Sequence, residues 1–384
     1  MTGMKRLLSA LLACWMLLAC AGAEEEPLEE RMAKILKYQK TMGAVVYVAK
    51  DGEIVSEYCY GYADRKSKEL VSPDTYFRTA SVTKLVSGIH VMQLVEQGLL
   101  ELDAPIGDYL GYEVKNLYYP EVPVTLRHLM SHTCSLSPHG GYCVTSRPLQ
   151  QIIDASLKRK GNWFEYEPGS KYVYSNFGAG IMGSLAEIAT GKNINDSMGE
   201  MLFAPLEIDA ALHPALLEQP ELVASQYTDA GKTKRSRAYV LAEEWDASVN
   251  PEMHYRITVG SLWIRGRDLC RLGIMMCQNG MLEGRQVLQE STVQQMMADQ
   301  KGQGYVTVSS PYGLCVNRVE GILEDRLIYG HQGMSNGVLC NLYWEPESQL
   351  VFALITNGSK NNMNDHVAVL ARRLFAQVWE EFGE

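Results

Sequence analysis

The chain has 384 residues, of which 46% are hydrophobic and 21% are charged, a balance typical of a globular protein. Its formal net charge of −10 argues against nucleic acid as a partner, because phosphates require a basic surface, and against electrostatic docking on an anionic membrane. No fixed-period repeat is present, which excludes solenoids and propellers.

The first 23 residues are typical of a secretory signal peptide. Lys5 and Arg6 precede an apolar run over 7–18 that is too short to span a bilayer comfortably. Small residues at 21–23 then lead into three glutamates, as at a cleavage site. A buried N-terminal helix is the alternative, and the abrupt acidic flank argues against it. We expect residues 1–23 to be removed on export, leaving no transmembrane span.

A lipid anchor is a second possibility for the N-terminus. Residues 17–20, Leu-Leu-Ala-Cys, are similar to a bacterial lipoprotein box, in which cleavage precedes the cysteine and a lipid is attached to its sulfur. Leucine is unusual at the middle position, and the remaining tether would be short. Soluble export is therefore favoured, and a lipid anchor at Cys20 stays open.

The cysteine count bears on disulfides and metal sites. Removal of the leader would leave seven of the nine cysteines, an odd number, and no pair has C-x-x-C spacing. The pattern indicates neither a zinc ribbon nor a disulfide framework, and at least one thiol must stay free. A chain of this length can bury enough apolar surface to fold without disulfides.

The elements that follow the leader are a helix, a hairpin and a second helix. Apolar residues at helical spacing predict a helix over 27–38, and β-rich runs over 45–48 and 54–60 flank Asp51-Gly52, a hairpin signal. A helix over 82–95 is apolar on most sides, as expected in the centre of a large domain.

The middle and the end of the chain differ in character. The middle, from about 99 to 285, is predicted to be mainly helical, with helices over 179–190 and 266–277. Strands are then predicted over 312–319, 327–331, 337–344 and 350–356, and an amphipathic helix over 367–382.

These elements predict an α/β (α+β) fold. Strands near both ends of the chain would form one antiparallel sheet, flanked by the N- and C-terminal helices and interrupted by a large, mainly helical insertion. We expect a single domain over 24–384, with the helical subdomain at about 99–285.

The first chemical motif is Ser81-Val82-Thr83-Lys84, at the start of the apolar helix. Residues three apart on a helix share a face, so the Lys84 amine can lie beside the Ser81 hydroxyl. The helix N-terminus supplies unpaired N–H groups, and burial favours the neutral amine that a base requires. S-x-x-K alone is a weak signal, since a chain of this size contains it about once by chance.

The second motif is Tyr174-Ser175-Asn176, which follows a turn at 167–171. A phenol could transfer a proton, and the Asn176 amide could bind a substrate. Taken alone, an aromatic core residue beside a turn asparagine is the simpler interpretation.

The third motif, residues 329–334, lies on a predicted strand and reads Tyr-Gly-His-Gln-Gly-Met. The small residues around His331, including Gly333, would let a substrate backbone approach the strand edge and its free N–H groups. Taken alone, a solvated histidine at a strand end is again the simpler interpretation.

Together the three motifs are far more specific. Their order and spacing, 93 residues from Ser81 to Tyr174 and 157 from Tyr174 to His331, resemble the class C β-lactamase and D,D-peptidase family of serine hydrolases. Other segments similar to that family are 98–105, 124–133, 167–178, 312–314 and 330–337. The resemblance covers about residues 30–380.

The resemblance implies a role for each motif residue. Ser81 would be the nucleophile that forms an acyl-enzyme, Lys84 its base, and Tyr174 the group that passes the proton to the leaving group. Asn176 would bind the substrate amide, and the backbone N–H groups of Ser81 and Met334 would form the oxyanion hole. No cofactor is implied.

The sequence departs from the family in two places. His331-Gln332-Gly333 stands where penicillin-binding members often have Lys-Thr-Gly, and an imidazole is charged only below its pKa, normally about 6.5. Recognition of a substrate carboxylate should therefore be weaker at neutral pH. Residues 132–136 read His-Thr-Cys-Ser-Leu instead of His-Thr-Ser-Gly-Leu, which implies an altered loop near the cleft entrance, where Cys143 could pair with Cys134.

Other sites have weaker support. His128 and His132, with His139 nearby, have helical metal-ligand spacing, but no glutamate stands where a metalloprotease needs one. The resemblance accounts for His128 and His132 structurally, so we expect no metal site. Cys134 lacks a cysteine-protease signature.

We therefore expect a peptidase or esterase that acts on D-amino-acid or ester substrates, small molecules or peptides, through an acyl-enzyme. A true β-lactamase is the second interpretation. A non-hydrolytic sensor of penicillins or wall fragments is the alternative from another class, and the presence of Ser81, Lys84 and Tyr174 together argues against it.

Overall fold

The computed structural model describes residues 26–137, 147–158, 162–228, 231–300, 312–360, 362–364 and 366–383. The predicted signal peptide and Cys20 lie outside these ranges. Within them, no helix is long and apolar enough to cross a membrane.

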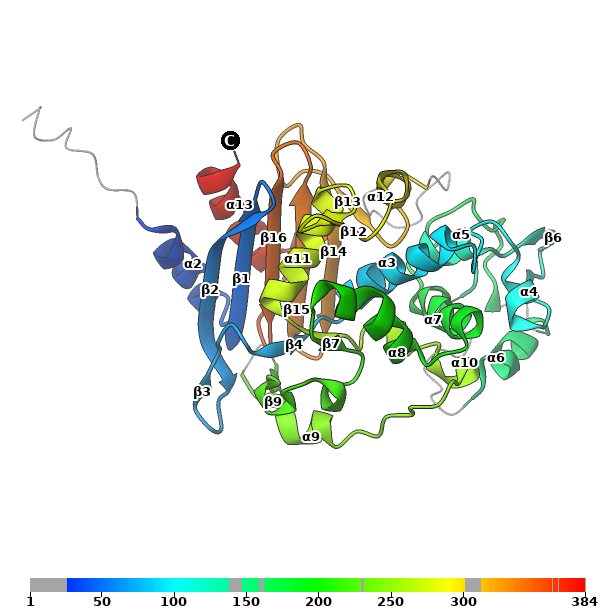
Figure 1. The fold of residues 1–384 in the computed structure, drawn as a ribbon, viewed down its shortest axis with the longest axis horizontal. Helices are drawn as coiled ribbons and strands as arrows, with labels where there is room; N and C mark the ends of the chain where they lie inside the picture. The colour runs from blue at the N-terminus through cyan, green and yellow to red at the C-terminus, as the bar shows by residue number, and fades with distance from the viewer. Residues whose placement is uncertain are drawn as a thin grey trace, which may run out of the picture.

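A seven-stranded antiparallel sheet is built from both ends of the chain (Figure 1). Its spatial order is β13-β14-β15-β16-β1-β2-β3. The strands are β1 (Gly43–Lys50), β2 (Glu53–Asp64), β3 (Glu69–Leu70), β13 (Asn317–Val319), β14 (Ile328–Ser335), β15 (Val338–Glu345) and β16 (Leu350–Thr356). β1 and β16 join the two ends of the chain, with Ala44 opposite Thr356 and Lys50 opposite Leu350. The predicted antiparallel sheet is confirmed.

Helices cover both faces of this sheet. Successive side chains of a strand point to opposite faces, and β1 is buried on both. Val45 and Tyr47 pack in the core that contains α3 (Val82–Glu96) and α11 (Gly266–Cys277). Val46 packs in the other core, under α2 (Leu28–Tyr38) and α13 (Val369–Phe382). The N- and C-terminal helices therefore flank the sheet, as predicted.

The hairpin turns follow from residues that accept positive φ. Asp51 and Gly52 link β1 to β2 with φ of 52° and 87°, and Asn336 and Gly337 link β14 to β15 with φ of 53° and 86°. Two-residue turns with both φ values positive match the twist of the flanking strands. The hairpin predicted at residues 51–52 is confirmed.

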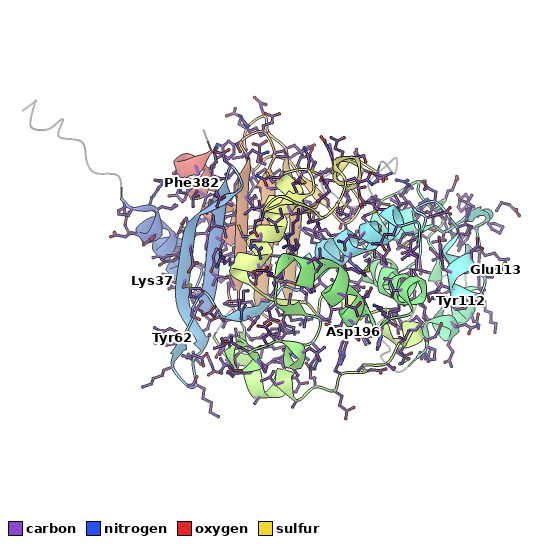
Figure 2. All side chains as sticks on the ribbon, viewed as in Figure 1. Lys37, Tyr62, Tyr112, Glu113, Asp196 and Phe382 are labelled. Carbon is purple, nitrogen blue, oxygen red and sulfur yellow. The ribbon has the colours of Figure 1, made fainter. Side chains whose placement is uncertain are left out.

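The regular structure between β3 and β13 is mainly helical, and much of this part of the chain extends away from the sheet, apart from α11, which packs on it (Figure 1). Its other helices are α4 (Ile106–Leu110), α5 (Leu126–Met130), α6 (Leu149–Ser156), α7 (Asn176–Thr190), α8 (Ile194–Met198), η2 (Gly199–Phe203), η3 (Ala204–Leu206), η4 (Pro214–Leu216), η5 (Pro220–Leu222), α9 (Arg237–Leu241), α10 (Pro251–His254), η6 (Ile257–Val259) and α12 (Glu290–Met297). In Figure 2, Tyr112 and Glu113 lie at the end of the molecule opposite Lys37 of α2.

Short strands make up the remaining regular structure. β4 (Tyr76–Arg78), β10 (Trp263–Arg265) and β7 (Ala210–Ala211) form a small sheet next to the start of α3. The two-stranded pairs are β5 (Lys115–Asn116) with β6 (Tyr119–Pro123), β8 (Gln226–Tyr227) with β9 (Thr233–Arg235), β11 (Met281–Leu282) with β12 (Arg285–Gln286), and β17 (Met363–Asn364) with β18 (Val367–Ala368).

Helix α3 runs from the sheet into the helical part and is buried from Val82 to Leu94. Gly98 follows it with a φ of 71°, a conformation that stops a helix and suits glycine. The prediction of a central apolar helix is confirmed. Helix α7 begins at Asn176, three residues before the predicted start, because the Ser175 hydroxyl accepts the Gly178 N–H at 3.0 Å and caps it.

The prediction of a strand over 312–319 is wrong for most of its length. Only Asn317–Val319 is a strand, because the chain turns at Cys315, whose φ is 57°. Tyr312 joins Asn317 through an isolated bridge. The last helix begins at Val369 and not at residue 367, since 367–368 form β18.

Candidate active site

Ser81 and Lys84 lie at the N-terminal end of α3. Ser81 directly precedes the helix and is partly exposed, whereas Lys84 is completely buried. The Lys84 Nζ atom lies 3.1 Å from Ser81 Oγ and donates a hydrogen bond of 2.8 Å to the Val259 carbonyl. One turn of helix thus brings the amine to the hydroxyl, as their spacing predicts.

The environment of Lys84 favours its neutral form. Burial lowers the pKa of Lys84 to about 7, and the nearby Cys315 opposes this slightly. Near pH 7 a substantial fraction of the amine is therefore uncharged and can accept the proton of an attacking serine.

The residues before Ser81 form a strained turn, 79–81, which we call the nucleophile turn. Ala80 has a φ of 48°, in the left-handed region that a residue with a Cβ rarely adopts. The Thr79 N–H donates to the Leu262 carbonyl at 2.9 Å, and the Thr83 hydroxyl donates to the Ala80 carbonyl at 2.7 Å. These bonds hold the turn, and the Ser81 side chain is partly exposed.

Tyr174 is brought to this end of α3 from residues 171–175, the tyrosine segment, which has no regular structure. Its hydroxyl lies close enough to the Ser81 side chain for that contact to lower its pKa, and Lys84 Nζ lies 5.1 Å from the centroid of its ring. Burial raises the pKa of Tyr174, and the contact with Ser81 offsets this only in part. Tyr174 is therefore a neutral phenol at neutral pH.

Asn176 and Gly333 also lie near Ser81 or Tyr174. Asn176 is half-buried and is the first residue of α7, two residues after Tyr174. A Cβ atom at Gly333 would stand 2.3 Å from the Thr79 carbonyl oxygen and 2.7 Å from the Ser81 nitrogen. Only glycine lets β14 approach the nucleophile turn so closely.

Met334 follows Gly333 on β14, and its side chain is exposed. β14 pairs with β13 only from Ile328 to Gly330, so β13 does not cover the strand beyond Gly330. The backbone of Met334 thus lies beside the nucleophile turn, on an edge of β14 with which no other strand of the described residues pairs beyond Gly330.

His331 is not the solvated histidine, with a pKa of about 6.5, that its place at a strand end suggests. It is buried, with Nδ1 2.7 Å from the Gln332 carbonyl and Nε2 3.0 Å from the Tyr312 hydroxyl. Burial, followed by the charge of Lys84, lowers the pKa of His331 to about 3. A carbonyl can only accept, so the neutral ring carries its hydrogen on Nδ1 and Tyr312 donates to Nε2. His331 therefore has no positive charge at neutral pH.

Three residues that contact Lys84, Tyr174 or His331 were not predicted as site residues: Val259, Tyr312 and His132. The His132 ring lies 4.3 Å from the ring of Tyr174 and 4.9 Å from that of Tyr312, measured between centroids. Residue spacing carries no signal for these contacts, because they join segments that meet only in the folded chain.

The other sites considered from the sequence take structural roles or lie outside the described ranges. His128 Nδ1 accepts the Thr125 N–H at 3.3 Å and caps α5. In the described part of the chain, no three side chains of His, Cys, Asp or Glu cluster as a metal would require. Burial raises the pKa of Cys134 to about 11, and His139 and Cys143 are not among the described residues.

Comparisons with known proteins agree with this geometry. The family model described as Beta-lactamase matches residues 28–377. The chain is 26% identical to penicillin-binding protein 4 of Amycolatopsis lactamdurans over 340 residues, 86% of this chain and 84% of that protein. It is 32% identical to esterase EstB of Burkholderia gladioli over 208 residues, 50% of this chain and only 52% of the esterase.

Among solved structures, the D-amino acid amidase of Ochrobactrum anthropi SV3 has the same fold. The TM-score is 0.70 at 20% identity, over 92% of this chain and 99% of the amidase. The family match over most of the chain, together with the Ser81 and Lys84 geometry, leads to one conclusion. The chain belongs to the β-lactamase family of serine hydrolases.

Proposed function

We propose that this protein hydrolyses ester or amide bonds through an acyl-enzyme formed on Ser81, with small D-amino-acid or ester compounds as substrates. The observation that carries the proposal is the 3.1 Å contact between Ser81 Oγ and a buried amine, Lys84, whose pKa is lowered to about 7. An exposed lysine would be protonated at this pH and could not act as a base.

In the proposed acylation, Ser81 Oγ forms a bond to the substrate carbonyl carbon while its proton passes to the Lys84 amine. The bond to the leaving group then breaks, and the leaving group takes a proton from Tyr174, which Lys84 reprotonates. Water reverses the sequence and frees the acid. The contact of Tyr174 with the Ser81 side chain supports its assignment as the proton donor, since the phenol is neutral at pH 7 and holds the proton to be transferred.

The oxyanion would be held by the backbone N–H groups of Ser81 and Met334. The close approach of Gly333 to the Ser81 nitrogen supports this assignment, because it brings the two backbones together. Removing one such donor from a hydrolase typically costs about 10²–10³ in rate. Asn176, at the start of α7, would bind the substrate amide.

The substrate class follows from the neutrality of His331. A penicillin or a D-Ala-D-Ala peptide presents a carboxylate beside the bond to be cleaved, and His331 offers it neither a positive charge nor an unbonded ring nitrogen. Neutral esters and D-amino-acid amides therefore rank above β-lactams. The names of two related proteins, an esterase and a D-amino acid amidase, agree with this order.

A substrate panel tests the proposal. We expect turnover of p-nitrophenyl esters and of D-amino-acid p-nitroanilides, with slower turnover of the L-isomers and of nitrocefin. Nitrocefin as the best substrate would make the protein a β-lactamase. A stable stoichiometric adduct with an ester or a fluorophosphonate, without turnover, would make it a non-hydrolytic sensor.

We also propose that the protein is exported. The proposal rests on the basic, apolar and small-residue pattern of residues 1–23, with acylation of Cys20 as the alternative. Mass spectrometry of the mature protein distinguishes the two, since cleavage after Ala23 leaves Glu24 at the N-terminus and lipoprotein processing leaves a lipidated Cys20. Retention of residues 1–23 would contradict both.

A further inference from the structure

His132 contacts the tyrosine segment on both sides of Tyr174. Its carbonyl accepts the Val173 N–H at 2.9 Å, and its ring Nδ1 accepts the Ser175 N–H at 3.2 Å. One residue thus holds the two chain neighbours of Tyr174, although it lies 42 positions away in the sequence.

The ring of His132 also packs against the side chain of Tyr174. The two centroids are 4.3 Å apart with the planes at 45°, and the Tyr312 ring lies 4.9 Å from the imidazole. His132 is itself buried and has a φ of 58°, so its backbone is held in the left-handed region. A residue in this conformation persists only where its surroundings fix it.

The hydrogen bond to Ser175 determines the protonation state of the ring. An N–H group can only donate, so Nδ1 must be unprotonated and the ring hydrogen must lie on Nε2. Burial, and then the charge of Lys84, hold the pKa of His132 well below its usual value. Nε2 is buried and has no hydrogen-bond partner among the described residues, so Nδ1 makes the ring's hydrogen bond.

We propose that His132 is the positioning residue of Tyr174: by accepting the Ser175 N–H, it fixes the phenol beside Ser81. The proposal rests on the function proposed above, because it requires Tyr174 to transfer a proton during acylation. The tyrosine segment has no helix or strand of its own to fix the phenol, and a displacement of about 1 Å can cost up to about 10² in rate.

Two variants separate the acceptor from the rest of the side chain. His132→Asn places an amide oxygen near the position of Nδ1 and tolerates a positive φ. His132→Phe keeps an aromatic ring but cannot accept the Ser175 N–H. We expect the kcat/KM for an alkyl ester, whose alkoxide leaving group needs a proton, to stay within about fivefold of wild type in His132→Asn and to fall about 10–100-fold in His132→Phe.

A double-mutant cycle with Tyr174→Phe tests whether His132 acts through Tyr174. If it does, His132→Phe lowers kcat/KM by less than about threefold once the Tyr174 hydroxyl is absent. A purely structural effect would lower kcat/KM by the same factor in both backgrounds, and that result would overturn the proposal. Equal losses in His132→Asn and His132→Phe would overturn it as well.

Urea unfolding identifies any variant that fails to fold. If His132→Phe fails to fold, His132→Gln replaces it in the cycle. The glutamine amide stands one methylene farther from the backbone than the asparagine amide, so it does not take the position of Nδ1. The cycle is interpreted only if the wild type hydrolyses the ester. Absence of hydrolysis would count against the proposed function, whereas hydrolysis with additive effects would count against the role of His132 alone.

Discussion

The candidate active site has two parts, Ser81 with Lys84 and Tyr174, and the chain positions them in different ways. Ser81 and Lys84 are neighbours on one helix, so their 3.1 Å contact depends on a single turn of local structure. Tyr174 reaches the same place from an irregular segment held by hydrogen bonds to His132.

This difference indicates where the site tolerates change. A buried helix cannot shift without disturbing the core, so the position of the Lys84 amine is fixed. Burying this amine lowers the free energy of unfolding. The tyrosine segment depends on a few hydrogen bonds, so the phenol can be misplaced by a change that leaves the core intact. The following variants test the two parts, from the largest expected effect to the smallest.

Lys84→Met should reduce kcat/KM by at least about 10³, because the proposed general base is lost. The same variant should be more stable at pH 7 by on the order of 2 kcal/mol, because removing the cost of a buried amine outweighs the loss of its hydrogen bond to the Val259 carbonyl. The exposed Lys37→Met on α2 is the control and should change neither quantity.

The stability gain of Lys84→Met should depend on pH with a defined sign. The unfolded lysine keeps its proton up to about pH 10.4, whereas the native amine has a pKa of about 7. Between these values the unfolded state binds more protons, so the stability of the wild type rises with pH. Urea unfolding should therefore show a larger gain at pH 7 than at pH 9. A less stable variant at pH 7 would contradict the account.

Tyr174→Phe should slow acylation by about 10²–10⁴, because the leaving group loses its proposed proton donor while the ring packing is kept. The kcat/KM for an alkyl ester, which reports acylation, gives the rate, because an alkoxide leaving group needs a proton whereas p-nitrophenolate leaves without one. Tyr62→Phe on β2 is the control, since Tyr62 is exposed and lies outside the cluster around Ser81. A near-normal acylation rate would remove Tyr174 from the mechanism.

Gly333→Ala should lower kcat/KM by about 10–10², since a Cβ atom would push β14 away from the nucleophile turn and displace the proposed oxyanion donors. Gly199→Ala is a matched control, because Gly199 has a φ of −57° and open space around its added Cβ. An effect within twofold at Gly333 would show that the strand does not need this close approach.

The pH dependence of the wild type gives the smallest effect. We expect kcat/KM to rise about tenfold per pH unit below the Lys84 pKa of about 7 and to level off above it, because the base must be deprotonated. The Lys37→Met variant should give the same profile. A kcat/KM that falls as the pH rises from 6 to 8 would contradict the role of Lys84.

The parts of the molecule that could be predicted from the sequence are those with local causes. The central helix, the hairpin at Asp51-Gly52 and the contact between Ser81 and Lys84 each follow from spacing within a few residues. The wrong strand over 312–319 and the missed role of His132 have the opposite cause. Tyr312 bonds to His331, and His132 to the tyrosine segment, through contacts that exist only once the chain has folded.

The central claim is that Ser81 is the residue that becomes acylated. Mass spectrometry of the protein after exposure to a fluorophosphonate tests it directly, on the wild type and on Ser81→Ala, with urea unfolding to confirm that the variant folds. The account predicts one adduct, located on Ser81 and absent from the variant. An adduct on another residue, or labelling that persists in Ser81→Ala, would contradict it.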